Sequence, residues 1–272
     1  MIEVNKKIMR LFWSSCLIVY IGGFLVFFAL RTMHNSLFFS IFVMLLLEVM
    51  GIIFCYIFMY KYFSNACNDR TIAMLNQCVA LPYIEEMQTF LAQSKNLWKN
   101  KEKSIEFLIA NAYRYYGDFE KAHEIYQKLS VQKLTELHKF QMKIYESMMY
   151  MEEGNLTQAE AYLQQVLSSP KKERFLKMSV MKSAAIDIQI LEASIKYKKN
   201  EMDVQELLPI LQSAREDYTA TKLWKYRRII NVLEKEGRTD IALPYRNMIS
   251  NISGDFLLLH NDVILGEGEV HE

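Results

Sequence analysis

The sequence predicts an all-α protein of two parts, a hairpin of two transmembrane helices followed by an α-helical solenoid of antiparallel helix pairs. Three observations support this fold class. Two long apolar runs lie near the start of the chain, patterns of two short helices joined by a turn recur after them, and the 272 residues include only 9 glycines and 4 prolines. Because glycine and proline mark turns, their scarcity indicates long helices with few connections and excludes an ordinary all-β protein.

The two apolar runs are long enough to cross a bilayer. The first, from Leu11 to Leu30, has no formal charge, and the second, from Leu37 to Tyr60, is interrupted only by Glu48. About 20 helical residues, at a rise of 1.5 Å each, cover the roughly 30 Å hydrocarbon core of a membrane. We therefore expect a hairpin over residues 1–60 that is inserted in the lipid bilayer, with spans at 11–30 and 37–60. A cleaved signal peptide is the alternative for the first run, but its apolar core would be too long and a second span follows at once.

Lysine and arginine flank the two runs on their outer sides. The connection between the runs contains only Arg31 of these two residue types, whereas others stand before the first run or after the second: Lys6, Lys7, Arg10, Lys61 and Arg70. Positively charged flanks stay on the cytoplasmic side of a membrane. We therefore expect an integral, multi-pass protein of a bacterial plasma membrane with both termini in the cytoplasm.

One carboxylate, Glu48, lies near the middle of the second span. A lone carboxylate at that depth is costly unless it is protonated or paired. Folding the hairpin about the middle of its connection places Tyr20 opposite Glu48, so an intramembrane polar pair of Tyr20 and protonated Glu48 is expected. The alternatives are a contact from Glu48 to a transmembrane partner and a proton-coupled role. Small residues are expected to let the two spans approach closely, and these are Gly22, Gly23 and Gly51.

The most regular helix–turn–helix pattern lies between Phe107 and Leu129. Two short amphipathic helices meet there at one glycine, with a small residue and a ring before it and an alanine and a ring after it: Ala110, Tyr113, Gly117 with Asp118, Ala122 and Tyr126. The same features recur 37 residues later at Tyr150, Gly154 with Asn155, and Ala159. Alanine lets two helices approach closely, and glycine adopts the backbone shape that such a turn needs.

These residues resemble the tetratricopeptide repeat, a unit of about 34 residues that stacks into solenoids. Proteins of that family bind other proteins and catalyse nothing. The resemblance implies three or four repeats over residues 101–252, the last with Gly237 as its turn and Ala242 as its packing alanine.

The flanks of the repeat region are less regular. Residues 61–100 are expected to form a helical connector in which the second span continues past Phe63, and their later part has the pattern of a degenerate repeat. The third repeat is expected to hold one helix over residues 173–198 before a turn near Asn200. Residues 253–272 lose the helical period, so we expect them to cap the last repeat or to form a mobile tail.

The resemblance also implies where a partner docks. In the family, the first helix of each pair lines a concave groove, and the matching residues here are Phe107, Asn111, Arg114, Tyr115, Ile144, Met148 and Met151. Such a groove is apolar and rich in methionine, and it suits an amphipathic helix or a hydrophobic segment. The alternative is that Ile144, Met148 and Met151 are core residues that face the neighbouring repeat.

The sequence contains no motif typical of an enzyme. We find no nucleotide-binding glycine loop, no HExxH or Cys/His ligand spacing and no GxSxG, so we expect no catalytic residues, no metal site and no cofactor. A net charge of +1 gives no field that would favour nucleic acid, and basic clusters such as Arg227 with Arg228 are expected on solvated helix faces.

The expected function is that of a membrane-anchored scaffold or adaptor for protein–protein interaction, which presents a cytosolic groove to a protein or peptide partner. A peptide-sensing membrane regulator that signals through the hairpin is the alternative. A membrane enzyme is a third class, and only Glu48 supports it.

Overall fold

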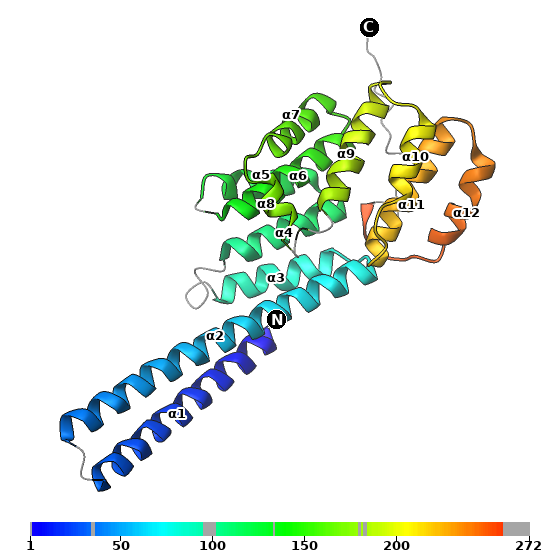
Figure 1. Cartoon of the computed structure of the whole chain (residues 1–272). Coiled ribbons are helices and arrows are strands. Elements are labelled where there is room, and N and C mark those ends of the chain that lie inside the picture. Colours follow the sequence, from blue (N-terminus) through cyan, green and yellow to red (C-terminus); the bar gives the residue numbers. More distant parts are fainter. Residues whose placement is uncertain are drawn as a thin grey trace. The chain divides into compact units, whose positions relative to one another are not determined.

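The computed structural model describes residues 2–33, 36–94, 102–132, 134–178, 181 and 184–257 (Figure 1). Within these residues the chain is helical and has no strand, which confirms the all-α prediction. The chain divides into two compact units, which we call the N-terminal unit (Met1–Thr71) and the C-terminal unit (Ile72–Glu272).

Two long apolar helices make up the N-terminal unit, and the second continues into the C-terminal unit. They are α1 (Ile2–Thr32) and α2 (Leu37–Gln77). Both are long and apolar enough to cross a membrane, and almost none of their most apolar stretch is buried within the protein. Because α2 continues well past Tyr60, as expected from the sequence, the boundary between the units falls at Thr71.

Two of the three glycines in the hairpin lie where the helices touch. A Cβ atom on Gly51 would lie 2.3 Å from Val19 Cγ1, and one on Gly23 would lie 3.1 Å from Glu48 Cγ. Any larger residue at Gly51 would therefore push the helices apart. Nothing lies within 4 Å of the corresponding position at Gly22, so the prediction that Gly22 serves close approach is wrong.

The C-terminal unit is built from helices that pack in consecutive pairs. The pairs are α4 with α5, α6 with α7, α9 with α10, and α11 with α12, while α3 packs against α4 and α7 packs against α9. The helices are α3 (Leu81–Ser94), α4 (Glu102–Tyr116), α5 (Phe119–Ser130), α6 (Glu136–Glu152), α7 (Leu156–Leu167), α8 (Lys172–Leu176), α9 (Ala184–Lys198), α10 (Val204–Gln212), α11 (Thr219–Lys235) and α12 (Thr239–Ile249).

Each pair turns at one residue with a left-handed backbone. The φ angles are +95° at Gly117, +80° at Gly154, +59° at Asn200 and +71° at Gly237, which confirms the four predicted turn positions. The next amide then donates to the carbonyl five residues earlier, as Asn155 N does to Tyr150 O at 2.8 Å and as its counterparts do after the other three turns. This hydrogen bond ends a helix abruptly, and it requires a residue that tolerates positive φ.

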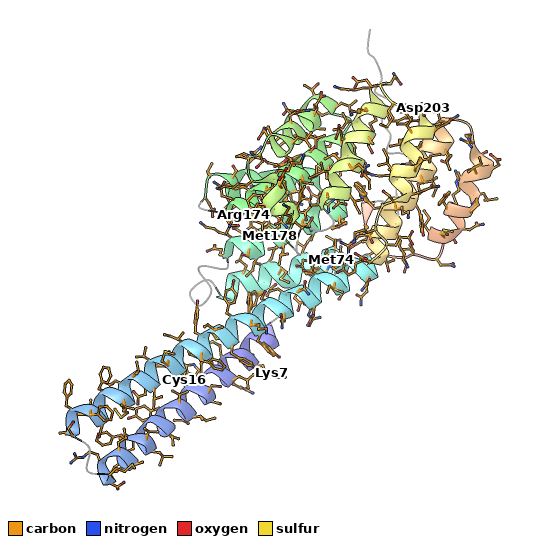
Figure 2. The ribbon with its side chains drawn as sticks, viewed as in Figure 1. Lys7, Cys16, Met74, Arg174, Met178 and Asp203 are labelled. Atoms are coloured by element: carbon orange, nitrogen blue, oxygen red, sulfur yellow. The ribbon has the colours of Figure 1, made fainter. Side chains whose placement is uncertain are left out.

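Short polar side chains start the next helix after several of these turns. Asp118 accepts a hydrogen bond from Lys121 N, and Asn155 accepts one from Gln158 N, each at 3.2 Å. Asp203, which Figure 2 labels at the start of α10, accepts one from Glu206 N at 2.8 Å. These side chains satisfy amides that have no partner within the helix.

The end of α2 uses the same turn without a glycine. Cys78 has φ +53°, and Val79 N donates to Met74 O at 3.3 Å. The Cys78 side chain is buried, as is that of Met74, which Figure 2 labels on α2. The predicted connector over residues 61–100 is therefore two helices, the end of α2 and then α3, and its last residues lie outside the described part of the chain.

The prediction of one helix over residues 173–198 is wrong. The chain forms the short helix α8 and then α9. Phe175 on α8 and Met181, which lies between the two helices, are both buried in one core cluster. The ring of Phe175 lies 5.3 Å from that of Phe140 on α6. A straight helix carries residues six positions apart to different faces, so a break is needed for both side chains to reach that core.

The packing alanines lie at points of close helix approach. Ala122 and Ala159 are completely buried. On the facing helix α6, Ser147 is also buried, and its Oγ donates to the carbonyl of Ala159 at 2.6 Å. A hydroxyl that reaches a backbone carbonyl of the partner helix leaves no room for a longer side chain at either position.

We therefore expect Ala159→Leu to lower the free energy of unfolding of the C-terminal unit by about 1–3 kcal/mol through overpacking. Ala161→Leu, at an exposed position of the same helix, is the matched control and should change it by less than about 0.5 kcal/mol. Urea denaturation of the detergent-solubilised full chain measures both. Equal effects of the two substitutions would show that Ala159 is not a close contact.

Candidate functional site

A small pocket lies on the side of the C-terminal unit where the first helices of the pairs meet. We call it the inner pocket. Its free volume is about 20 Å³, which is room for about one water molecule. Helices α4, α5, α6 and α11 line it together with one side chain that follows α12: Arg114, Tyr115, Phe119, Met148, Met149, Glu152, Trp224 and Leu257.

Three of the seven predicted groove residues line this pocket, and a fourth orients one of them. Arg114, Tyr115 and Met148 are part of its wall. Asn111 accepts a hydrogen bond from Arg114 Nε at 3.0 Å. The guanidinium of Arg114 lies 4.3 Å from the ring centroid of Tyr115 and 5.0 Å from that of Tyr145, so it is held by rings on two helices.

The prediction of an open groove is wrong for Phe107, Ile144, Met148 and Met151. These side chains are only 2–8% exposed. Three of them belong to the core cluster in which α6 packs against α9, the first helix of the next pair. The alternative, that this stripe on α6 is core, is therefore correct. Phe107 packs among the rings of Tyr126, His138 and Tyr145 at 5.3–5.9 Å.

An ion pair that the sequence analysis missed involves Glu152 of the pocket wall. Arg228 on α11 donates through Nη2 to Glu152 Oε1 on α6 at 2.6 Å, and its guanidinium stacks on Trp224 at 3.2 Å from the ring centroid. Its Nη1 is buried and has no hydrogen-bond partner among the described residues. The expectation that Arg228 lies on a solvated face is wrong, and its spacing of four residues from Trp224 was the available signal.

A buried carboxyl on α9 lies within the electrostatic reach of these arginines. Burial raises the pKa of Asp187 to about 6, although the positive charges of Arg114, Arg228 and Arg215 oppose that change. Charges from four first helices therefore gather on one inner surface, which we define by Arg114, Glu152, Asp187 and Arg228.

The segment after α12 closes the inner pocket. We call Gly254–Leu257 the strap. Asp255 accepts hydrogen bonds from Ala80 N at 2.5 Å and Leu81 N at 2.8 Å, and its own amide donates to Cys78 O at 3.0 Å. The carboxylate thus caps the start of α3, where backbone amides lack partners within the helix.

The two apolar side chains of the strap pack against the first helix pair. Phe256 is 1% exposed and stacks on Tyr115 with ring centroids 4.9 Å apart. Leu257 lies so close to Gly117 that a Cβ there would be 2.8 Å from it. The expectation that this region caps the last repeat or is a mobile tail is therefore wrong for the strap. Residues 258–272 lie outside the described part of the chain.

The predicted pair of Tyr20 and Glu48 does not form. Tyr20 is 58% exposed and stacks on Phe24, whereas Glu48 lies against Gly23. The hairpin folds about a point later than the one assumed, which moves the residue opposite Glu48 by about one helical turn. Glu48 Oε1 is buried and has no hydrogen-bond partner among the described residues.

A further polar cluster joins α5 to α6 on another side of the unit. His123 Nδ1 lies 2.5 Å from Glu146 Oε2, and its Nε2 lies 3.3 Å from Glu153 Oε2. The ring also stacks on Tyr150. Within the described ranges, no three His, Cys, Asp or Glu side chains are arranged to hold a metal ion.

The raised pKa of Asp187 gives a pH dependence of stability. The folded chain favours protonated Asp187, so its contribution to stability is complete below about pH 4 and is lost as the pH rises through about 6. Asn cannot ionise, and we therefore expect Asp187→Asn to match the wild type at pH 4 and to be more stable by roughly 1–3 kcal/mol at pH 7.5.

Urea denaturation of the full chain in detergent at the two pH values measures this difference, with the exposed Asp240→Asn as the control. A variant that is less stable than the wild type at pH 7.5 would mean that attraction to the arginines outweighs burial.

Comparison of the chain with protein-family models, with curated proteins and with solved structures finds no match in any of the three. Evidence for a function therefore comes from the chain's own residues.

Proposed function

We propose that this protein is a membrane-anchored scaffold or adaptor whose C-terminal unit binds a segment of a partner protein at the inner pocket. The observation that carries the proposal is the convergence of Arg114, Glu152 and Trp224 from three first helices on a pocket whose wall also includes Leu257, a side chain from elsewhere in the chain. Arg228 binds Glu152 of that wall. A site that accepts a side chain from a distant segment has the shape and chemistry for a peptide.

The pocket offers both parts of a peptide-binding site. Tyr115 and Trp224 present apolar rings, and such rings favour aliphatic and aromatic side chains. Arg228 contacts Glu152 and Trp224 of the pocket wall, and its Nη1 is a buried donor without a partner among the described residues. Leaving such a donor unsatisfied is costly, so a ligand that brings a carbonyl or carboxylate to it gains a charge-assisted hydrogen bond.

The helix pairs support a tetratricopeptide-like solenoid as the scaffold of this site. Their left-handed turns and buried alanines match the residues on which the resemblance rests. The unit departs from that pattern at α8 and at the prolines Pro209 and Pro244, which lie inside the second helices of the last two pairs. Our proposal is therefore a solenoid of four pairs in which the third and fourth are irregular.

Insertion of α1 and α2 in a bilayer supplies the anchor. Exposed apolar side chains along both helices fit lipid, and the basic flanks favour cytoplasmic termini. Glu48 is only partly buried, and its Oε1 has no hydrogen-bond partner among the described residues. Because a carboxyl in hydrocarbon needs a polar neighbour, this favours a contact from Glu48 to a transmembrane partner.

A peptide-sensing regulator remains the second candidate, and one observation favours it. A single helix, α2, contains the second apolar run and also supplies buried residues such as Met74 to the C-terminal unit. A helix that belongs to both units provides a continuous mechanical element for a signal.

The proposal predicts that Arg228→Gln lowers partner capture at least tenfold, because it removes the unsatisfied donor and the cation that is bound to Glu152 and stacked on Trp224 of the pocket wall. Lys222→Gln removes the same charge from an exposed position of α11 and is the matched control. Tagged full-length variants expressed to equal levels are crosslinked in native membranes, purified and compared by quantitative mass spectrometry. Circular dichroism checks that each variant keeps its helices.

Two results would contradict the scaffold. Identical capture by Arg228→Gln and the wild type would exclude the inner pocket as the binding site. If a short peptide instead of a protein co-purifies with the wild type and with Lys222→Gln, but not with Arg228→Gln, the result would favour the regulator.

The proposed orientation predicts that a reporter active only outside the cytoplasm is silent when it is fused after Glu272. The same reporter inserted between Thr32 and Leu37 should be active, because two spans place the connection on the far side of the membrane. Activity at Glu272 with silence at the connection would reverse the orientation.

A further inference from the structure

We propose that the strap, Gly254–Leu257, is an intramolecular ligand that occupies the partner site, and that the partner displaces it with a segment of the same chemistry: glycine, a carboxylate, an aromatic ring and a branched aliphatic side chain. This inference rests on the proposed function and specifies it further. It makes the strap an autoinhibitory contact and defines the kind of partner that relieves it.

The carboxylate of the strap binds groups that any peptide could reach. Among the described residues, Asp255 forms its hydrogen bonds with backbone groups, namely Ala80 N, Leu81 N and, through its own amide, Cys78 O. Backbone amides at a helix start recognise a carboxylate wherever it comes from. A partner segment with Asp or Glu at this position would therefore form the same bonds.

The position before the carboxylate accepts only glycine. Gly254 has φ +151°, and a Cβ there would lie 2.1 Å from Cys78 O. That distance is far below any van der Waals contact, and the obstacle is backbone, which cannot rotate away as a side chain does. The site therefore selects a glycine followed by a carboxylate.

The two following positions select an aromatic and an aliphatic side chain. Phe256 stacks on Tyr115 at an interplanar angle of 23°, and Leu257 lies against Gly117 and lines the inner pocket. Offset stacking favours another ring over an aliphatic group. Gly117 has no side chain, which leaves room for the leucine.

The strap competes with a partner by its tether. Only residues 250–253 separate the strap from the end of α12, and such a short tether holds the strap at its site at roughly millimolar effective concentration. A partner then binds with an affinity reduced by the fraction of chains in which the site is free.

The test uses full-length protein in detergent and a fluorescent peptide with the sequence of residues 251–257, Asn-Ile-Ser-Gly-Asp-Phe-Leu. Phe256→Ser releases the strap. We expect this variant to bind the peptide at least tenfold more tightly than the wild type, and to lose binding when Ser replaces Phe in the peptide. Leu243→Ser, an exposed apolar position on α12, is the matched control and should bind as the wild type does.

A second measurement reports whether Cys78 is covered and uses a different change in the strap. Cys78 is completely buried, with Gly254 directly against it, and burial together with the charge of Asp255 raises the pKa of its thiol to about 11. In a chain with Cys16, Cys55 and Cys67 replaced by Ala, Asp255→Asn should accelerate maleimide labelling of Cys78 at least tenfold, and saturating peptide, which covers Cys78 with its own Gly-Asp, should restore the slow rate. If Phe256→Ser fails to fold, this labelling rate alone decides.

The outcomes separate this inference from the proposed function. Equal peptide affinity of Phe256→Ser and wild type, with an unchanged labelling rate, overturns the strap as a competing ligand and leaves the binding pocket in place. The inference about the strap is also overturned if Phe256→Ser does not bind the peptide but still captures partners in a way that depends on Arg228. If Phe256→Ser folds but neither binds the peptide nor captures partners, both the inference about the strap and the proposed function are refuted.

Discussion

The hydrogen bond from the residue after each turn to the carbonyl five residues earlier is the constraint on which the C-terminal unit depends. It ends a first helix within one residue and sends the chain back along it, which only a left-handed residue such as Gly154 allows. Helices α4, α6, α9 and α11 then come close enough for Glu152 to bind Arg228 and for Asp187 to respond to both Arg114 and Arg228. The inner pocket is thus a consequence of how the helices end.

The features that could be predicted from the sequence are those that depend on neighbouring residues. A glycine followed by Asp or Asn has one favourable backbone shape at a helix end, so the turns at Gly117 and Gly154 were predictable from a few neighbouring residues. The hairpin helices were predictable from composition. The buried stripe of Met148 and Met151 was not, because the same spacing of apolar residues fits both an open groove and the face of the next pair.

The rest of the site depends on contacts between segments far apart in sequence. Arg228 binds Glu152, which lies 76 residues away in sequence, and the strap contacts the start of α3 at a still greater sequence separation. No pattern within a window of one helix indicates such a meeting. The predicted register of the hairpin was wrong for a related reason. The residue that faces Glu48 depends on where the chain reverses, and a shift of one helical turn moves every contact along both helices.

The long separation between the strap and its site also sets the order in which the unit folds. The helix pairs are local, with partners a few residues apart, and local contacts form early because short loops cost little entropy to close. The strap contact joins residues 175 positions apart and reaches helices that emerge from the ribosome long before it. During synthesis the surfaces of Tyr115 and Gly117 are therefore formed before Phe256 and Leu257 can cover them, and at about 5–20 residues per second a nascent chain leaves these surfaces exposed until the strap emerges.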